Sequence, residues 1–237
     1  MKKISISIFS ILFALVLTST KLSAGSIGLG VSGSYMSIEA DGKETSDTTG
    51  SETDTSTNTK AVDNNVIIAG IYAEYVLDNG FAIGIESVPG SADVSDRVLS
   101  RADTVLSKTG TDTTTSATRN FKANAEVEDY FNYYIEVPLF SENLFAKVGY
   151  TEIDVNTTEV ASDNGGSYGN ASLDGFMYGI GYKTKPTDST KIKFAYEATD
   201  FDTLSLTSSG NSVASETNKI TADLDTWAVK VSFGFEF

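Results

Sequence analysis

The chain has 237 residues, a formal net charge of −15, no cysteine and no histidine. Such an acidic chain does not bind nucleic acid by neutralising phosphates, and without cysteine it holds no disulfide and no thiol-dependent site. The length permits one or two domains. Because the pattern of predicted strands and polar loops is the same along the whole chain, we predict one domain.

The first 24 residues have the features of a secretory signal peptide. Met1-Lys2-Lys3 is a positive head, residues 4–17 are mostly apolar, and Leu22-Ser23-Ala24 is a small-residue cleavage site. The alternative is a membrane anchor helix, but the apolar run is short against the roughly 20 residues that a spanning helix needs. The predicted signal peptide contains three lysines and no acidic residue, so removing it changes the net charge from −15 to −18.

The pattern after residue 25 is one of strands with two different faces. The first strand is predicted at 26–38 and the second at 66–77. Between them, residues 41–65 form a polar tract in which ten of the first twenty residues are Ser or Thr. Such a tract cannot bury a core of its own, so we expect a long loop there.

The second and third strands form a predicted hairpin. Asp78-Asn79-Gly80 predicts a tight turn, because Asn and Gly tolerate positive φ. The third strand starts at 81, and Pro89-Gly90 ends its regular part or marks a bulge. A second long loop is expected at 96–123. Inside this loop, helical spacing predicts a short amphipathic helix that contains Val98, Leu99, Ala102, Val105 and Leu106. The alternative is an irregular loop with scattered hydrophobic residues.

Long loops and short turns alternate along the rest of the chain. Short turns are predicted at 141–143 and around Pro186, and long loops at 161–174 and 208–225. An even number of strands joined in this way is typical of outer-membrane barrels, with long loops outside and both termini in the periplasm. The last five strands are predicted at 126–139, 144–160, 176–183, 192–206 and 226–237.

The last strand alternates most regularly. Every odd position from Trp227 to Phe237 is large and apolar, and every even position from Ala228 to Glu236 is small or polar. At the edge of a soluble sheet such a strand would invite aggregation. It suits the closing strand of a barrel whose outer wall touches lipid.

Alternation alone does not show which face points outward, because a soluble eight-stranded ligand carrier has apolar side chains inside. Two properties of the polar face favour its placement inside. It is rich in glycine, as a narrow filled interior requires. Its charges nearly balance, and buried charges persist when they are paired. We therefore predict an interior charge network, with Glu236 near the rim, made of Glu74, Glu86, Glu136, Glu197, Lys147, Lys183, Lys193 and Lys230.

The apolar face has the aromatic residues of a membrane protein. Aromatic girdles at the two membrane interfaces are predicted from Tyr35, Tyr75, Phe81, Tyr150, Phe176, Tyr182 and Trp227. In hydrocarbon an unpaired backbone group costs several kcal/mol, so the first strand must pair with the last. The predicted fold is all-β: an eight-stranded antiparallel up-and-down transmembrane β-barrel over 25–237, with an interior that side chains fill.

The chain resembles a known family, the small eight-stranded outer-membrane barrels of Gram-negative bacteria (opacity-protein and porin-family barrel domains). The resemblance lies in the signal peptide, the strand spacing, Ala73-Glu74-Tyr75, the stretch 130–139 and the ending 233–237. It implies a bacterial outer-membrane location, contact with lipid, surface-exposed loops and no shared catalytic residues. It also implies insertion by the outer-membrane assembly machinery through a C-terminal sorting strand that contains Trp227, Phe233, Phe235 and Phe237.

Three functions are compatible with this sequence. The first is a structural or surface-interaction barrel with a filled polar interior, whose loops bind a surface ligand in adhesion, reception or envelope integrity. The second is a narrow channel for ions or small solutes. The third is an enzyme, which we rank last because small barrels that act on lipids or peptides commonly use a histidine. We predict no catalytic residue, no cofactor and no metal site.

Overall fold

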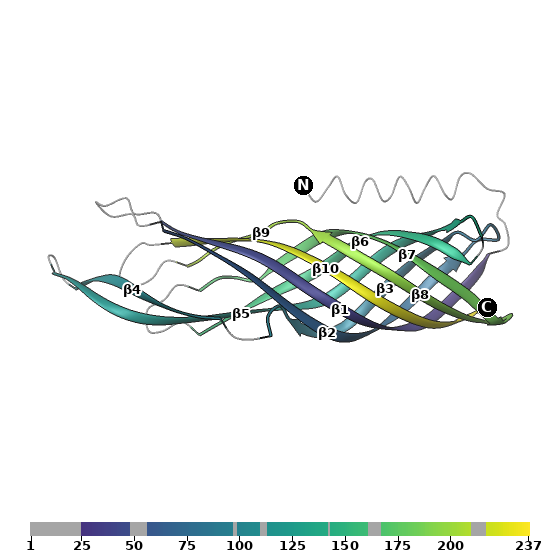
Figure 1. The fold of residues 1–237 in the computed structure, drawn as a ribbon, viewed down its shortest axis with the longest axis horizontal. Helices are drawn as coiled ribbons and strands as arrows, with labels where there is room; N and C mark the ends of the chain where they lie inside the picture. The colour runs from purple at the N-terminus through teal and green to yellow at the C-terminus, as the bar shows by residue number, and fades with distance from the viewer. Residues whose placement is uncertain are drawn as a thin grey trace.

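The computed structural model describes residues 25–47, 56–96, 99–109, 113–141, 143–160, 167–209 and 217–237. The predicted signal peptide lies outside these residues. Among them no helix is long and apolar enough to cross a membrane. The strands (Figure 1) are β1 (Ser26–Asp47), β2 (Ser56–Val76), β3 (Ala82–Asp93), β4 (Leu99–Thr109), β5 (Thr113–Leu139), β6 (Leu144–Val160), β7 (Ala171–Thr187), β8 (Thr190–Phe201), β9 (Leu204–Thr207) and β10 (Thr217–Glu236).

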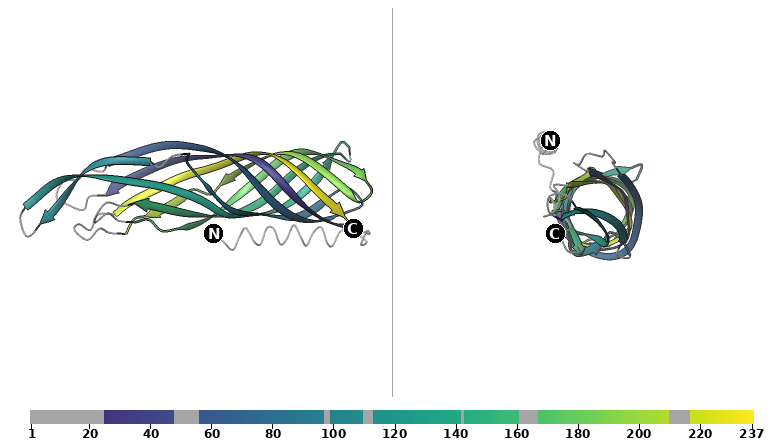
Figure 2. Two further views of the ribbon diagram at one scale, coloured as in Figure 1. Left: turned by 90° about the horizontal axis from the view of Figure 1, so that it is seen from below. Right: turned by 90° about the vertical axis from the view of Figure 1, so that its left-hand side faces the viewer.

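Eight of these strands close into a barrel. Their order is β1-β2-β3-β5-β6-β7-β8-β10, and β10 returns to pair with β1 from Gly28↔Glu236 to Asp47↔Thr217. Every pairing is antiparallel. Seen along its axis the molecule is a ring (Figure 2). The predicted eight-stranded up-and-down barrel, closed by the first and last strands, is confirmed.

The strands run further than the sequence predicted. β1 continues to Asp47 and β2 begins at Ser56, so both enter the predicted first loop; β10 begins at Thr217, inside the predicted fourth loop. The predicted helix within 96–123 is wrong over its described part. Residues 99–109 form β4, which pairs with β5 from Leu99↔Ala123 to Thr109↔Thr113. Thr and Val favour strands. Backbone pairing with β5 stabilises the strand more than the short run of helically spaced apolar residues could stabilise a helix.

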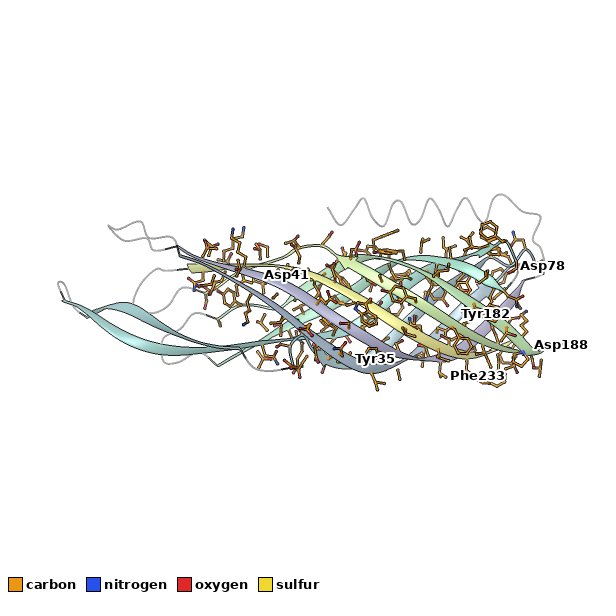
Figure 3. The ribbon with its side chains drawn as sticks, in the orientation of Figure 1. Tyr35, Asp41, Asp78, Tyr182, Asp188 and Phe233 are labelled. Carbon is orange, nitrogen blue, oxygen red and sulfur yellow. The ribbon has the colours of Figure 1, made fainter. Side chains whose placement is uncertain are left out.

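The two ends of the barrel differ. Asp78 and Asp188, in two of the short turns, lie at the same end as the C-terminus (Figures 1 and 3). There Phe237 N donates to Ile27 O (3.0 Å) and Ile27 N donates to Phe237 O (3.2 Å). We call this the turn end. The opposite end, the loop end, carries the β4–β5 hairpin, which extends beyond the barrel (Figure 1).

An apolar belt surrounds the barrel toward the turn end. On β1 the outward residues from Ile27 to Tyr35 are apolar or glycine, and Glu39 lies beyond them. These nine residues match the roughly 9–11 that a strand needs to cross a membrane. Large apolar side chains exposed on this wall identify the membrane-spanning part; Figure 3 shows Tyr35, Tyr182 and Phe233 among them. They include Ile27, Leu29, Val31, Tyr35, Ile71, Tyr75, Ile85, Val148, Phe176, Tyr178, Ile180, Tyr182, Phe194, Tyr196, Val229, Val231, Phe233 and Phe235.

The interior changes character where the belt ends. On β1 the inward residues Ser32 and Ser34 are polar, whereas Met36 and Ile38 are apolar and buried. Beyond the belt water bathes the outside, so burial of apolar surface stabilises the barrel from within. The sequence prediction of a polar interior is therefore wrong for the loop end. Its apolar core consists of Met36, Ile38, Val88, Val94, Tyr130, Ile153, Val155, Leu173, Leu204, Leu224 and Ala228.

Candidate functional site: the filled interior

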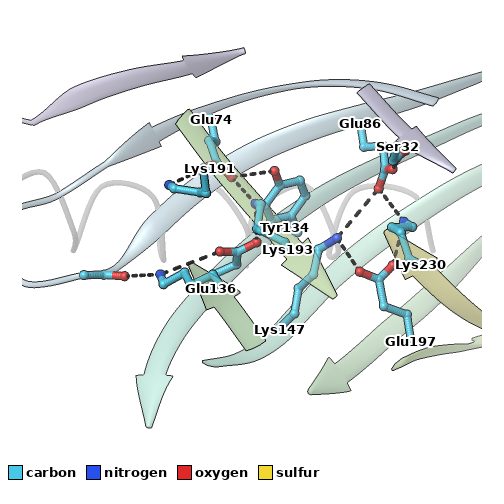
Figure 4. A network of polar contacts seen from close by, with 12 residues as sticks. Ser32, Glu74, Glu86, Tyr134, Glu136, Lys147, Lys191, Lys193, Glu197 and Lys230 are labelled. Carbon is cyan, nitrogen blue, oxygen red and sulfur yellow. Dashed lines mark hydrogen bonds and ion pairs between the residues drawn. The ribbon is translucent and has the colours of Figure 1, made fainter. Parts of the chain in front are cut away.

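A closed ring of four alternating charges fills one part of the belt interior (Figure 4). Lys230 Nζ donates to Glu86 Oε2 and to Glu197 Oε2, each at 2.7 Å. Lys147 Nζ donates to Glu197 Oε1 at 2.7 Å and lies 3.7 Å from Glu86 Oε2. Ser32 Oγ donates to Glu86 Oε1 at 2.6 Å. We call Glu86, Lys147, Glu197 and Lys230 the charge ring; its formal charge is zero.

An open chain of alternating charges leads from the interior to the turn end. Lys193 Nζ lies at its centre and donates to Glu74 Oε2 (2.6 Å) and Glu136 Oε1 (2.7 Å). Glu74 Oε1 accepts from Lys191 Nζ at 3.1 Å, and Glu136 Oε2 lies 3.9 Å from Lys183 Nζ. Beyond Lys191 the chain continues through Glu236 to Lys185, whose side chain is 52% exposed. We call these seven residues the charge chain.

The structure places all eight residues of the predicted charge network inside the barrel, each paired with an opposite charge. Glu236 was expected near the rim, where it contacts Lys185 and Lys191. Sequence reasoning missed Lys191, which is 2% exposed. Its position had a signal, because residues 191, 193, 195 and 197 share one face of β8.

Aromatic side chains occupy the space between these ions. Lys147 Nζ lies 4.1 Å from the ring centroid of Tyr134, and Lys193 Nζ lies 4.8 Å from that of Tyr72. Such cation–π contacts strengthen when they are removed from water. Tyr134 Oη also donates to Glu74 Oε2 at 3.0 Å. The hydroxyl and the ring therefore tie Tyr134 to both charge networks.

The space between the charge ring and the charge chain is nearly filled by side chains. A cavity between the ring and the chain, lined by Tyr72, Tyr134, Lys147 and Lys193 among others, has a volume of about 10 Å³. That is room for about one water molecule. Within the described residues, the belt interior is filled by side chains.

Carboxylates form a collar on the outer wall just beyond the belt. Glu39, Asp225 and Asp200 lie directly opposite one another on β1, β10 and β8, and Glu152 lies opposite Asp174. Partial burial and then the neighbouring carboxylates raise the pKa of Asp225. Among the residues that the structure describes, no group of three or more acidic side chains is arranged to hold a metal ion.

No protein-family model and no curated protein matches the chain. Among solved structures it is similar to the outer membrane protease OmpT from Escherichia coli, with 8% identity, a TM-score of 0.48, and coverage of 92% of this chain and 100% of that one. It is similar to Ail, the attachment invasion locus protein of Yersinia pestis, in complex with sucrose octasulfate, with 14% identity, a TM-score of 0.35, and coverage of 87% of this chain and 99% of that one. A third similar structure is that of the outer membrane protein AlkL, with 13% identity, a TM-score of 0.44, and coverage of 93% of this chain and 94% of that one. These likenesses carry no argument about function, so the fold is assigned from the chain's own closed strand pairing.

Proposed function

We propose that this protein is an outer-membrane barrel that presents its loop end to the outside as a binding surface, with an interior closed to solutes. The observation that carries the proposal is the contrast between the two halves. Inside the belt, the cavity between the charge ring and the charge chain has room for about one water molecule. Beyond the belt, the same strands continue around an apolar core. A filled membrane-spanning part that holds the loop end above the membrane suits a role in adhesion, reception or envelope integrity.

Location and assembly follow from the same features. The apolar belt would lie in the lipid of the bacterial outer membrane, and the C-terminal strand with Trp227, Phe233, Phe235 and Phe237 would be read by the assembly machinery. The four carboxylates Glu74, Glu86, Glu136 and Glu197 are each paired with lysine. Because these pairs leave no free general base among them, we propose no enzymatic role.

Planar-bilayer recording tests whether the interior is closed. The protein should insert without steady ion flux at neutral pH. The matched control is a variant in which all four members of the charge ring, Glu86, Lys147, Glu197 and Lys230, are replaced by alanine. This variant keeps the charge balance but removes the side chains that fill the lumen. A steady current through the wild type would favour the narrow channel instead.

Trypsin treatment of intact cells tests the orientation, and the chain contains its own control. Lys60 lies toward the loop end on β2 and is exposed, whereas Lys185 lies at the turn end and is also exposed. Cleavage on the loop-end side with Lys185 spared would support the proposal. Cleavage at Lys185 in intact cells would mean that the barrel has the opposite orientation.

A further inference from the structure

The barrel wall opens between β2 and β3 beyond the belt. β2 pairs with β1 along its whole length, from Ser26↔Val76 to Ser46↔Ser56. With β3 it pairs only from Val76↔Ala82 to Ile71↔Ser87. β3 itself stays paired with β5 as far as Asp93↔Glu126. From residue 70 toward the loop end, β2 and β3 therefore separate.

A proline explains where the pairing stops. Leu77 N donates to Phe81 O at 2.8 Å, so the odd-numbered residues of β2 turn their backbone groups toward β3. Continuing the register would place Pro89 opposite Ala69, and proline has no N–H to give. Gly90 follows with φ 101°, and the β3–β5 register shifts between Val88 and Ser91. The bulge bends β3 away from β2.

Among the described strands, this separation leaves one edge of β2 without a ladder. Its register with β1 is uninterrupted, so Ala61, Asp63, Asn65 and Ile67 direct their N–H and C=O groups toward the gap. The β3 side is protected by a proline and a bulge, as natural edges usually are, whereas β2 has neither. One hydrogen bond does cross the gap, from Asn64 Nδ2 to Asp93 O at 2.7 Å.

The gap also opens toward the apolar core. The inward residues Val62, Val66 and Ile68 on β2 pack against this core but are only partly buried. On the closed wall some inward residues are fully buried, such as Ile38 and Ile153 at 2% exposure, and others are also only partly buried, such as Val127. With the outward Ile67, which is 86% exposed, the three inward β2 residues form a strip of partly exposed apolar surface beside the free edge.

The outer rim of the gap is acidic. Asp63 and Asp93 are exposed on its two sides, and Glu126 lies opposite Asp93 on β5. An occupant that satisfies the free backbone groups, covers the apolar strip and complements this rim is an extended peptide. Its inward side chains would be apolar and its outward ones cationic. A second copy of this chain would instead bring the same carboxylates together.

We propose that β2 binds an added strand: an extended segment of a partner protein, with alternating apolar and Lys or Arg residues, in the gap between β2 and β3. Main-chain hydrogen bonds to 61–67 would supply affinity, and alternate side chains would supply specificity. This deepens the proposed function, since it rests on the loop end being the binding surface.

Purified protein in detergent tests this strand addition independently of orientation in cells, because both ends are accessible. The probe is the fluorescent peptide Val-Lys-Val-Lys-Val-Thr-Val-Lys. Its first control is a peptide of the same composition with the alternation removed, which keeps the charge. Its second control is the alternating peptide N-methylated at every other residue, which cannot pair with the edge. We expect saturable binding of the probe and at least tenfold weaker binding of both controls.

Two variants locate the site. Because the N–H of Asn65 points toward the gap, Asn65→Pro removes an edge donor but no β1–β2 bond, and it should weaken probe binding about tenfold; Asn65→Ser should not. The chain has no cysteine, so a bromoacetylated probe should label Asn65→Cys faster than Asp200→Cys, which is exposed on β8. Equal labelling, equal binding of the non-alternating peptide, or no saturable binding would overturn the proposal. If Asn65→Pro does not fold, the N-methylated peptide and the labelling decide.

Discussion

The ring of Tyr134 fills the space directly opposite Gly84, its register partner on β3. A Cβ at position 84 would lie 2.7 Å from Cε2 of Tyr134 and closer still to Cζ. Tyr72 has the same relation to Gly30, and Phe145 to Gly181. These three inward glycines therefore make room for the aromatic side chains that lie between the charged groups.

Gly84→Ala should destabilise the barrel, because the added methyl must displace Tyr134 and with it the hydrogen bond to Glu74. Overpacking of this kind costs roughly 1–3 kcal/mol. Urea unfolding in lipid vesicles measures the change. Gly33→Ala is the matched control: Gly33 faces outward on β1, and a Cβ there meets no atom within 4 Å. Equal unfolding midpoints for the two variants would contradict this role of Gly84.

Lys230→Met should destabilise the barrel by roughly 3–5 kcal/mol, as expected when one partner of a buried pair is removed. Lys230 donates two hydrogen bonds of 2.7 Å within the charge ring, to Glu86 and to Glu197, whereas Lys147 has one at this distance. Its loss leaves Glu86 with Lys147 at 3.7 Å. The free energy of unfolding in vesicles, with a folded-state check on unboiled gels, gives the magnitude.

The double variant Lys230→Met/Glu86→Gln supplies the control for that measurement. It leaves the Lys147–Glu197 pair, joined at 2.7 Å, and no uncompensated carboxylate. We expect it to recover part of the stability lost in the single variant. If the double variant is as unstable as the sum of its two single variants, the charge ring does not act as a unit.

Strand alternation predicted the closed barrel and the direction of most side chains, because a period of two needs only the local sequence. It placed Glu86 and Lys230 on the same inward face, although they are 144 residues apart. Alternation could not show which lysine joins which glutamate. That depends on the stagger between strands, and Lys193 reaches both Glu74 and Glu136.

The loop end was predicted less well, for a physical reason. There the outward side chains become polar and the inward ones apolar, so the strand pattern continues with its two faces exchanged. Residues 41–65 were predicted to be a loop because Ser and Thr are frequent in them, yet Val62 within this range packs against the apolar core. Pro89-Gly90 was predicted as a strand end or a bulge, and the structure has a bulge there. The β2–β3 gap was still hidden, because a bulge predicted from sequence does not show which neighbouring strand loses its pairing.

The exchange of faces gives a test on one strand. Val231 lies outward in the belt and is 47% exposed. Arginine at the middle of such a lipid-facing wall costs about 2–4 kcal/mol, so Val231→Arg should lower the free energy of unfolding in vesicles by that amount. Asp225→Arg, on the same face of β10 but beyond the belt, places the charge between Glu39 and Asp200 and should not destabilise. Equal losses for both variants would contradict the assigned boundary.

Asp225→Asn tests the carboxylate collar through its pH dependence. Partial burial, followed by the charges of Asp200, Asp223, Glu39 and Asp41, raises the pKa of Asp225. The folded protein therefore holds this proton more tightly than the unfolded chain does. The resulting stabilisation is complete below the unfolded pKa of about 3.9 and is lost as the pH rises through the folded value.

At neutral pH the wild type should therefore be less stable than Asp225→Asn, by roughly the 0.2–1 kcal/mol that like charges opposite one another cost. The difference should shrink toward zero as the pH falls to about 3, where the carboxyl group is neutral. Chemical unfolding of both proteins at several pH values measures it. Asp188→Asn, in the turn between β7 and β8, controls for the loss of one surface charge. A difference that is constant with pH, or that grows in acid, would show that the collar does not strain the folded state.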